Sequence, residues 1–355
     1  MYLPLEVTKT MALPEEASVP KTLKAPKQPI YQFLKRFSEG DMTGELFLRL
    51  ARNTYKTAPC DELDLEIKQF IEEHGRDIWK LLAGTEPTKT DLSNSMAFYN
   101  MFAPYLFATG WAKNKQVYEF DPQLEEMLTN TDSTNITGEY LKSLPYRTFY
   151  MDMSTIPIPS RFYNPLQGVF VHVYQTDADV CIAFLRVAKT DDGQIAYSGG
   201  IIQNNTTGEN DGTFCYQKPD DKDPNDPEWN DFCMFLINAV LYLCASNAEV
   251  EESEITKKTY RPPKTIKNKF SEIRAWHVGV RYGETIRMTR KKADMDMTDR
   301  VTHPGAGTPK RPHMRRGHWH HYRTGKGRTN LILKWIPPIL VGTGEITVVK
   351  HQVKP

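Results

Sequence analysis

Near its carboxyl end, the 355-residue chain concentrates side chains that bind anions, stack on rings or ligate metals. Arginine and lysine in residues 310–328 could donate hydrogen bonds to phosphate, and the tryptophan and tyrosine among them could stack on nucleobases. Interleaved cations and aromatic rings suit single-stranded RNA. The candidate residues for binding RNA, a ribosome or another partner are Arg311, His313, Arg315, Arg316, His318, Trp319, His320, Tyr322, Arg323 and Lys326.

The same stretch raises the question of a metal site, because four histidines lie within nine residues. If residues 317–323 form a strand, His318 and His320 share one face and His321 points the other way. Acidic or cysteine ligands that would complete a site do not lie nearby in the sequence. We therefore expect no metal and no cofactor, and keep His318 and His320 as the candidate ligands of a metal-dependent alternative. A structural alternative also stays open, in which this strand packs over a basic linker and its arginines pair with nearby carboxylates.

Motifs of common catalytic sites are missing from the sequence. It contains no P-loop, no G-x-S-x-G and no H-E-x-x-H. Gly199-Gly200 and Gly325-x-Gly327 are too short for phosphate loops, although the latter suits a tight turn between two strands. The cysteines lack a convincing partner for nucleophilic catalysis. We therefore expect a binding protein and assign no catalytic residue.

The net charge of +1 conceals an uneven distribution. Residues 257–328 contain 20 Lys and Arg against 5 Asp and Glu, a local balance of +15, so the rest of the chain has a balance of −14. Such a split favours an anionic partner for the basic part, either nucleic acid or an acidic protein face. The alternative is that the two oppositely charged parts pack on each other.

Several protein classes are disfavoured. No apolar run approaches the roughly 20 residues that span a bilayer, and the longest candidate, residues 232–245, is interrupted by Asn238 and predicts a buried helix. The first 27 residues lack the apolar core of a secretory signal. The five cysteines are widely spaced without C-x-x-C, which argues against disulfides or cysteine-bound zinc. We expect a cytoplasmic protein, with core packing for Cys181, Cys233 and Cys244.

The hydrophobic periodicity predicts an α+β fold. Helical spacing dominates early, including a short amphipathic helix from Asp61 to about Gly75, and a backing helix is expected over 231–246. Short β-rich runs at 148–153, 169–174, 180–187 and 194–202 predict a central antiparallel sheet, and later strands are expected at 275–282, 331–335 and 339–341. The expected organisation is a flexible leader (1–27), a helical part (28–135), the antiparallel sheet plus helix (136–250), a basic linker (251–309) and a C-terminal basic His/Trp-rich strand region (310–355).

A family resemblance lies in the carboxyl-terminal motifs. Lys310-Arg311-Pro312-His313, Arg315-Arg316-Gly317-His318-Trp319-His320, Tyr322, Gly325 and Trp335-x-Pro337 resemble the signature of a phage and mobile-element family. That family includes an anti-CRISPR protein against the type V-A effector nuclease. The regions 110–126, 144–152, 168–174 and 236–244 look similar in the same order, so the resemblance covers roughly residues 95–345. Arg323 departs from it, because an aromatic residue is expected there.

The resemblance implies an inhibitor that lowers production of the type V-A effector. Such a protein recognises the nascent N-terminal peptide of the nuclease, and decay of the translated message follows. The implied partners are that peptide and the translating ribosome or mRNA, in the cytoplasm of a bacterial host. The charge split would then provide an acidic face for a basic peptide and a basic face for RNA. Two alternatives stay open: a general RNA- or ribosome-binding regulator of a mobile element, and a metal-dependent nuclease built on the histidine cluster.

Overall fold

The structure is a computed structural model, and the part that it describes begins at Glu62. The described ranges are 62–83, 86–89, 103–104, 106–107, 110–111, 114–133, 136–154, 166–175, 179–189, 195–205, 214–216, 227–253, 273–301 and 313–341. The expected leader (1–27) and Arg311 lie outside them.

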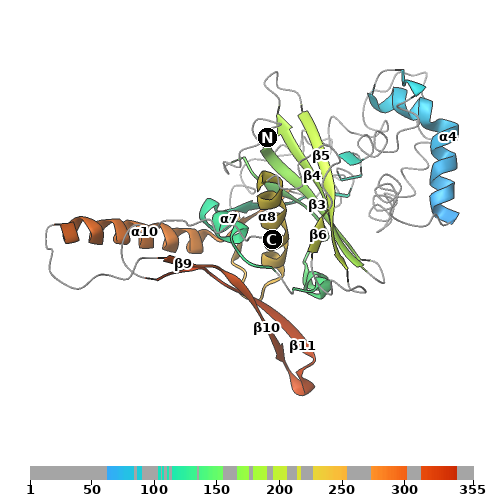
Figure 1. The fold of residues 1–355 in the computed structure, drawn as a ribbon. Helices are drawn as coiled ribbons and strands as arrows, with labels where there is room; N and C mark the ends of the chain where they lie inside the picture. Colours follow the sequence, from blue (N-terminus) through green and yellow to red (C-terminus); the bar gives the residue numbers. More distant parts are fainter. Residues whose placement is uncertain are drawn as a thin grey trace, which may run out of the picture.

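An eight-stranded sheet forms the centre of the molecule (Figure 1), in the order β6-β5-β4-β3-β2-β1-β8-β7. Strands β2 to β6 are antiparallel neighbours, as the β-rich runs predicted. Strand β1 instead runs parallel to both β2 and β8, so the sheet is mixed. The bounds are β1 Gln116–Phe120, β2 Thr148–Asp152, β3 Leu166–Gln175, β4 Asp179–Lys189, β5 Ile195–Asn205, β6 Phe214–Tyr216, β7 Val250–Glu252 and β8 Arg274–Val278.

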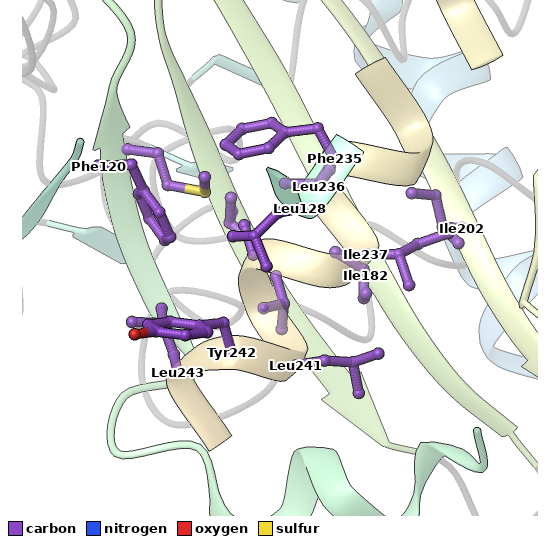
Figure 2. Packing of buried hydrophobic residues seen from close by; sticks show 14 of the residues in the cluster. Phe120, Leu128, Ile182, Ile202, Phe235, Leu236, Ile237, Leu241, Tyr242 and Leu243 are labelled. Atoms are coloured by element: carbon purple, nitrogen blue, oxygen red, sulfur yellow. The ribbon is translucent and has the colours of Figure 1, made fainter. Parts of the chain in front are cut away.

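Helix α8 (Pro227–Cys244) is the predicted backing helix, and it packs on one face of the sheet. Figure 2 shows its side chains meeting Phe120, Leu128, Ile182 and Ile202. The helix is apolar nearly all round because α7 (Pro122–Thr129) and the carboxyl-terminal strands cover its other sides. Cys181 and Cys233 lie in the core as expected, and Cys244 is half-buried.

The opposite face of the sheet is also buried. Tyr150 and Phe170 point away from α8, and the ring of Phe170 makes edge contacts with Tyr150 and Trp111, at ring-centroid distances of 4.9 and 6.2 Å. Both faces being covered explains why the central strands read as nearly continuous apolar runs. Together with the helices, the sheet confirms the predicted α+β class.

The expectation of a linker over 251–309 was wrong for residues 280–301, which form a helix, whereas the strand expected at 275–282 is confirmed as β8. Strand β8 ends at Val278, Gly279 adopts a φ of 76°, and α10 (Val280–Val301) follows. The sequence concealed this helix because polar contacts fix it more than an apolar stripe does. Its first turn donates the backbone N–H groups of Arg281 and Tyr282 to the carboxylate of Glu249, which acts as a distant N-terminal cap.

Of the remaining elements, the sequence predicted the first helix and the later carboxyl-terminal strands, but not the short 3-10 helices. Helix α4 (Glu62–Ala83) continues past Gly75, and the short 3-10 helix η2 (Gly138–Ser143) precedes β2. The carboxyl-terminal region contains two strand pairs, β9 with β12 and β10 with β11. Their bounds are β9 His313–Arg315, β10 His318–Thr324, η3 Lys326–Arg328, β11 Asn330–Ile336 and β12 Ile339–Val341. Within the described ranges, no helix is long and apolar enough to cross a membrane.

Candidate functional site

The candidate binding segment folds as a β-hairpin, β10–β11, which projects from the body of the molecule near the end of α8 (Figure 1). Its register pairs Trp319 with Trp335, His320 with Lys334, and Tyr322 with Ile332. The turn confirms the prediction made from Gly325-x-Gly327. Both glycines have positive φ, 82° and 77°, which a residue with a Cβ adopts at a cost.

The base of the hairpin is buried. Trp319, Leu333 and Trp335 are 7%, 2% and 0% exposed and join the main hydrophobic core. The ring of Trp335 makes edge contacts with Tyr242 of α8 and Tyr282 of α10, at 5.4 and 5.6 Å between centroids. The prediction that Trp319 stacks on a nucleobase was therefore wrong, because its ring is already packed inside the protein.

A buried polar network fixes both tryptophans. The indole N–H of Trp319 donates to Oδ1 of Asn238 at 2.7 Å, and that of Trp335 donates to Oγ1 of Thr131 at 3.2 Å. Nδ2 of Asn238 donates to the carbonyls of Leu128 and Thr131, both at 3.0 Å. Asn238 thus joins α7, α8 and the hairpin, and it satisfies three polar groups that would be costly to bury unpaired.

The sequence indicated Asn238 only as an interruption of an apolar helix. That interruption was the one indication available, because a lone amide in an apolar run requires buried partners. Residues just after α8 add further clamps. Asn247 exchanges two hydrogen bonds with the backbone of Trp335, at 2.8 and 3.0 Å, and the amide of Ser246 donates to the Leu333 carbonyl at 2.9 Å.

The outward face of the hairpin has the opposite character. Because side chains alternate along a strand, His318, His320 and Tyr322 share the face that does not bear Trp319. All three are exposed. The rings of His320 and Tyr322 stack with centroids 4.2 Å apart and 29° between planes, and Nζ of Lys334 lies 5.6 Å from the Tyr322 centroid. We call His318, His320, Tyr322 and Lys334 the outward face.

The predicted cations are distributed around this hairpin. Arg315 ends β9, Arg316 lies between β9 and β10, and Lys326 lies at the tip with Arg328; all are exposed. His321 and Arg323 point to the face opposite Tyr322. Arg323 lies near Tyr140, where its charge opposes the rise in the tyrosine pKa that burial causes. The backbone of His313 belongs to β9, and its side chain lies outside the described structure.

Arginines of α10 pair with carboxylates of the same protein. Arg287 bridges to Asp121 at 3.0 Å and Arg290 bridges to Glu126 at 2.9 Å, so α10 and α7 neutralise each other. The two helices approach closely, since a Cβ at Gly283 would collide with the Asp121 carboxylate. The hairpin differs. Within the described ranges, no carboxylate pairs with its cations or with those just before it: Arg315, Arg316, Arg323, Lys326, Arg328 and Lys334.

One carboxylic acid of α7 has a raised pKa. Glu125 of α7 is 9% exposed, and burial, assisted by the neighbouring Glu126 charge, raises its pKa to about 7. As for metals, His318 and His320 do share a face, as predicted for a strand. The described part of the chain contains no group of three or more His, Cys, Asp or Glu that could hold a metal ion.

The chain is similar to known proteins over more than half of its length. The Escherichia coli protein FinQ is 25% identical over 271 residues, which cover 66% of this chain and 75% of FinQ. Among solved structures, the crystal structure of AcrVA2 is similar to this chain. The match covers 88% of this chain and 98% of that chain at 15% identity, with a TM-score of 0.42. A family model matches residues 118–343, from β1 through the hairpin to just past β12. Since this match spans more than half of the sequence, the chain belongs to the AcrVA2-like family, the anti-CRISPR type V subtype A2 family.

Proposed function

We propose that this chain is an anti-CRISPR inhibitor that lowers production of a type V-A effector nuclease. It recognises the N-terminal peptide of the effector as that peptide leaves the ribosome, and decay of the message follows. The single observation that supports the proposal most is the family match over residues 118–343. That match includes the sheet, α8, α10 and the hairpin, so the proposed function belongs to the folded body and not to one short motif.

The proposed function needs two surfaces, one that recognises a peptide and one that contacts a ribosome or a message. Recognition of a peptide needs side chains held by a rigid scaffold, and the eight-stranded sheet with α8 provides one. Contact with a ribosome or a message needs unpaired positive charge, and the hairpin offers it. We propose that the protein acts in the bacterial cytoplasm, where translation occurs. We also propose that it performs no cleavage itself, so that host factors carry out the decay.

The experiment that tests this proposal separates codons from amino acids. A reporter message receives the N-terminal codons of the effector in three forms: native, synonymously recoded, and altered in amino-acid sequence at matched codon usage. Reporter message and protein are measured with and without this chain. We expect a fall for the native and recoded forms and no fall for the altered form. An effect that follows the nucleotide sequence instead would rule out recognition of a nascent peptide.

A second candidate function is a general RNA- or ribosome-binding regulator of a mobile element. The observation that favours it is the exposed cationic hairpin, whose charge is independent of any particular message. Sequencing all messages after induction of the chain distinguishes the two functions. A fall confined to messages that encode the effector peptide supports the first, and a broad change supports the second.

A further inference from the structure

We propose that the outward face of the β10–β11 hairpin, together with its tip, is a binding site for single-stranded RNA. In this site a nucleobase stacks on Tyr322, and Lys326, Arg328 and Lys334 contact the phosphates around it. The inference rests on the proposed function, for which it would supply the contact to a message or to ribosomal RNA. It has its own test, which uses purified protein and no effector.

The hairpin lies in a stretch of the sequence without carboxylates. No Asp or Glu occurs anywhere between Arg300 and Glu345, and the hairpin lies inside that interval. The arginines of α10 face carboxylates at about 3 Å, whereas the hairpin cations are exposed and have no such partner within the described ranges. We call the outward face and the tip (Lys326–Arg328) together the arm of the hairpin. Because it contains no carboxylate, the arm adds positive potential where a polyanion could approach it.

The ring of Tyr322 is exposed but held in place by its neighbours. Tyr322 is 40% exposed, although large apolar rings are usually covered. His320 and Lys334 both lie at the register position nearer the base of the hairpin than Tyr322, and both contact its ring. They hold the ring in place from that side, while Thr324 is its next neighbour toward the tip on the same face. A pre-ordered ring beside cations is the arrangement on which bases stack.

The outward face and the tip are accessible along the length of the hairpin. From Trp319 at the buried base to Thr324, the strand spans five residue steps, roughly 17 Å at the usual rise per residue. Over this length only one face of the hairpin packs on the core, through Trp335, Leu333 and the partly buried Leu331, so the outward face and the tip stay open to a strand of RNA. An acidic protein would satisfy the cations but would leave the ring without a role. A single strand uses both, because its bases are unpaired and available to stack.

The experiment measures binding of the full-length chain to a fluorescent oligouridine of about 12 nucleotides, a length within the usual site sizes. Fluorescence anisotropy is recorded across a range of salt concentrations. We expect Tyr322→Ala to weaken binding about fivefold or more and Tyr322→Phe to preserve it, because only the first variant removes the ring. The double variant Lys326→Ala/Arg328→Ala should lower the slope of log affinity against log salt by about 1.4, since two phosphate contacts are lost.

A matched control is Lys291→Ala, which removes an exposed cation of α10 outside the hairpin. It should leave affinity and slope nearly unchanged. An equal loss in Lys291→Ala, or no loss in Tyr322→Ala with its fold intact by circular dichroism, would overturn the proposal. Tighter binding of the matching deoxy oligonucleotide, or of an acidic peptide such as polyglutamate, would also overturn it by assigning the face to another partner.

The outcomes separate this inference from the proposed function. A chain that binds RNA as expected but leaves the native reporter untouched contradicts the proposed function alone. A chain that lowers the native reporter in a peptide-dependent way but shows no Tyr322-dependent binding contradicts the RNA site alone.

Discussion

The base and the arm of the hairpin share the strands β10 and β11 but differ in burial and in contacts. At the base, Trp319 and Trp335 are buried, hydrogen-bonded and packed on α8 and α10. On the arm, His320, Tyr322 and the tip cations are exposed. The two-residue alternation of a strand is enough to separate them. A basic, aromatic segment can therefore hold a structural anchor and a binding surface at once, and adjacent residues belong to different functions.

Because the base is buried and the arm is exposed, the largest loss of stability is expected for Trp335→Ala. Removing a fully buried indole leaves a cavity next to Tyr242 and Tyr282 and loses the bond to Thr131. We expect the free energy of unfolding to fall by about 3–5 kcal/mol. Urea denaturation followed by circular dichroism measures it. A loss below about 1 kcal/mol would mean that the hairpin base does not belong to the core.

A pH-dependent effect is expected from Glu125. Its folded pKa of about 7 exceeds the ordinary value of 4.5, so the unfolded chain loses this proton first as the pH rises. This group should therefore cost no stability below pH 4.5, an increasing amount up to pH 7, and a constant amount above that, at most about 3 kcal/mol. Glu125→Gln should remove this fall between about pH 4.5 and 7, as measured by urea denaturation at each pH. Parallel pH profiles for variant and wild type would contradict the raised pKa.

The polar network at the base predicts a loss of about 1–3 kcal/mol for Asn238→Ala, because Trp319 and two backbone carbonyls lose their partner. Trp319→Phe removes only the indole donor and its added volume. In a double-mutant cycle the two substitutions should be non-additive, with a coupling of about 1 kcal/mol. Simple additivity would show that the bond between Asn238 and Trp319 contributes nothing.

The smallest effect on stability is expected on the arm. Tyr322→Ala and Lys326→Ala should change the free energy of unfolding by less than about 0.5 kcal/mol, since both side chains are exposed. The same denaturation series measures them beside Trp335→Ala. If an arm variant destabilised the protein as much as a base variant, the division of the hairpin into anchor and surface would be wrong.

Sequence patterns predicted the elements whose apolar periodicity is strong. The strands β2 to β5, the helix α8 and the turn between β10 and β11 were found in this way, and so was the shared face of His318 and His320. Helix α10 was missed because Glu249, Asp121 and Glu126 hold it from distant positions in the sequence. Strand β1 was missed altogether, because it is only five residues long and lies within the part expected to be helical (28–135).

Within the candidate segment, the sequence did not distinguish the buried side chains from the exposed ones. Composition groups Trp319 with Tyr322, since both are aromatic residues among cations. Their different burial depends on which face of the strand meets α8, and that depends on Asn238, about eighty residues earlier. Lys334 was not predicted, because it reaches the outward face from the partner strand through the register of the hairpin.

The most direct test of the proposed function is the level of effector message with and without its translation. Cells with and without this chain express the effector message either intact or with its start codon removed, and message abundance is followed by quantitative PCR after transcription is stopped. Recognition of a nascent peptide predicts faster decay of the intact message and unchanged decay of the untranslated one. Equally fast decay of both messages would contradict the account, because no peptide is present on the second.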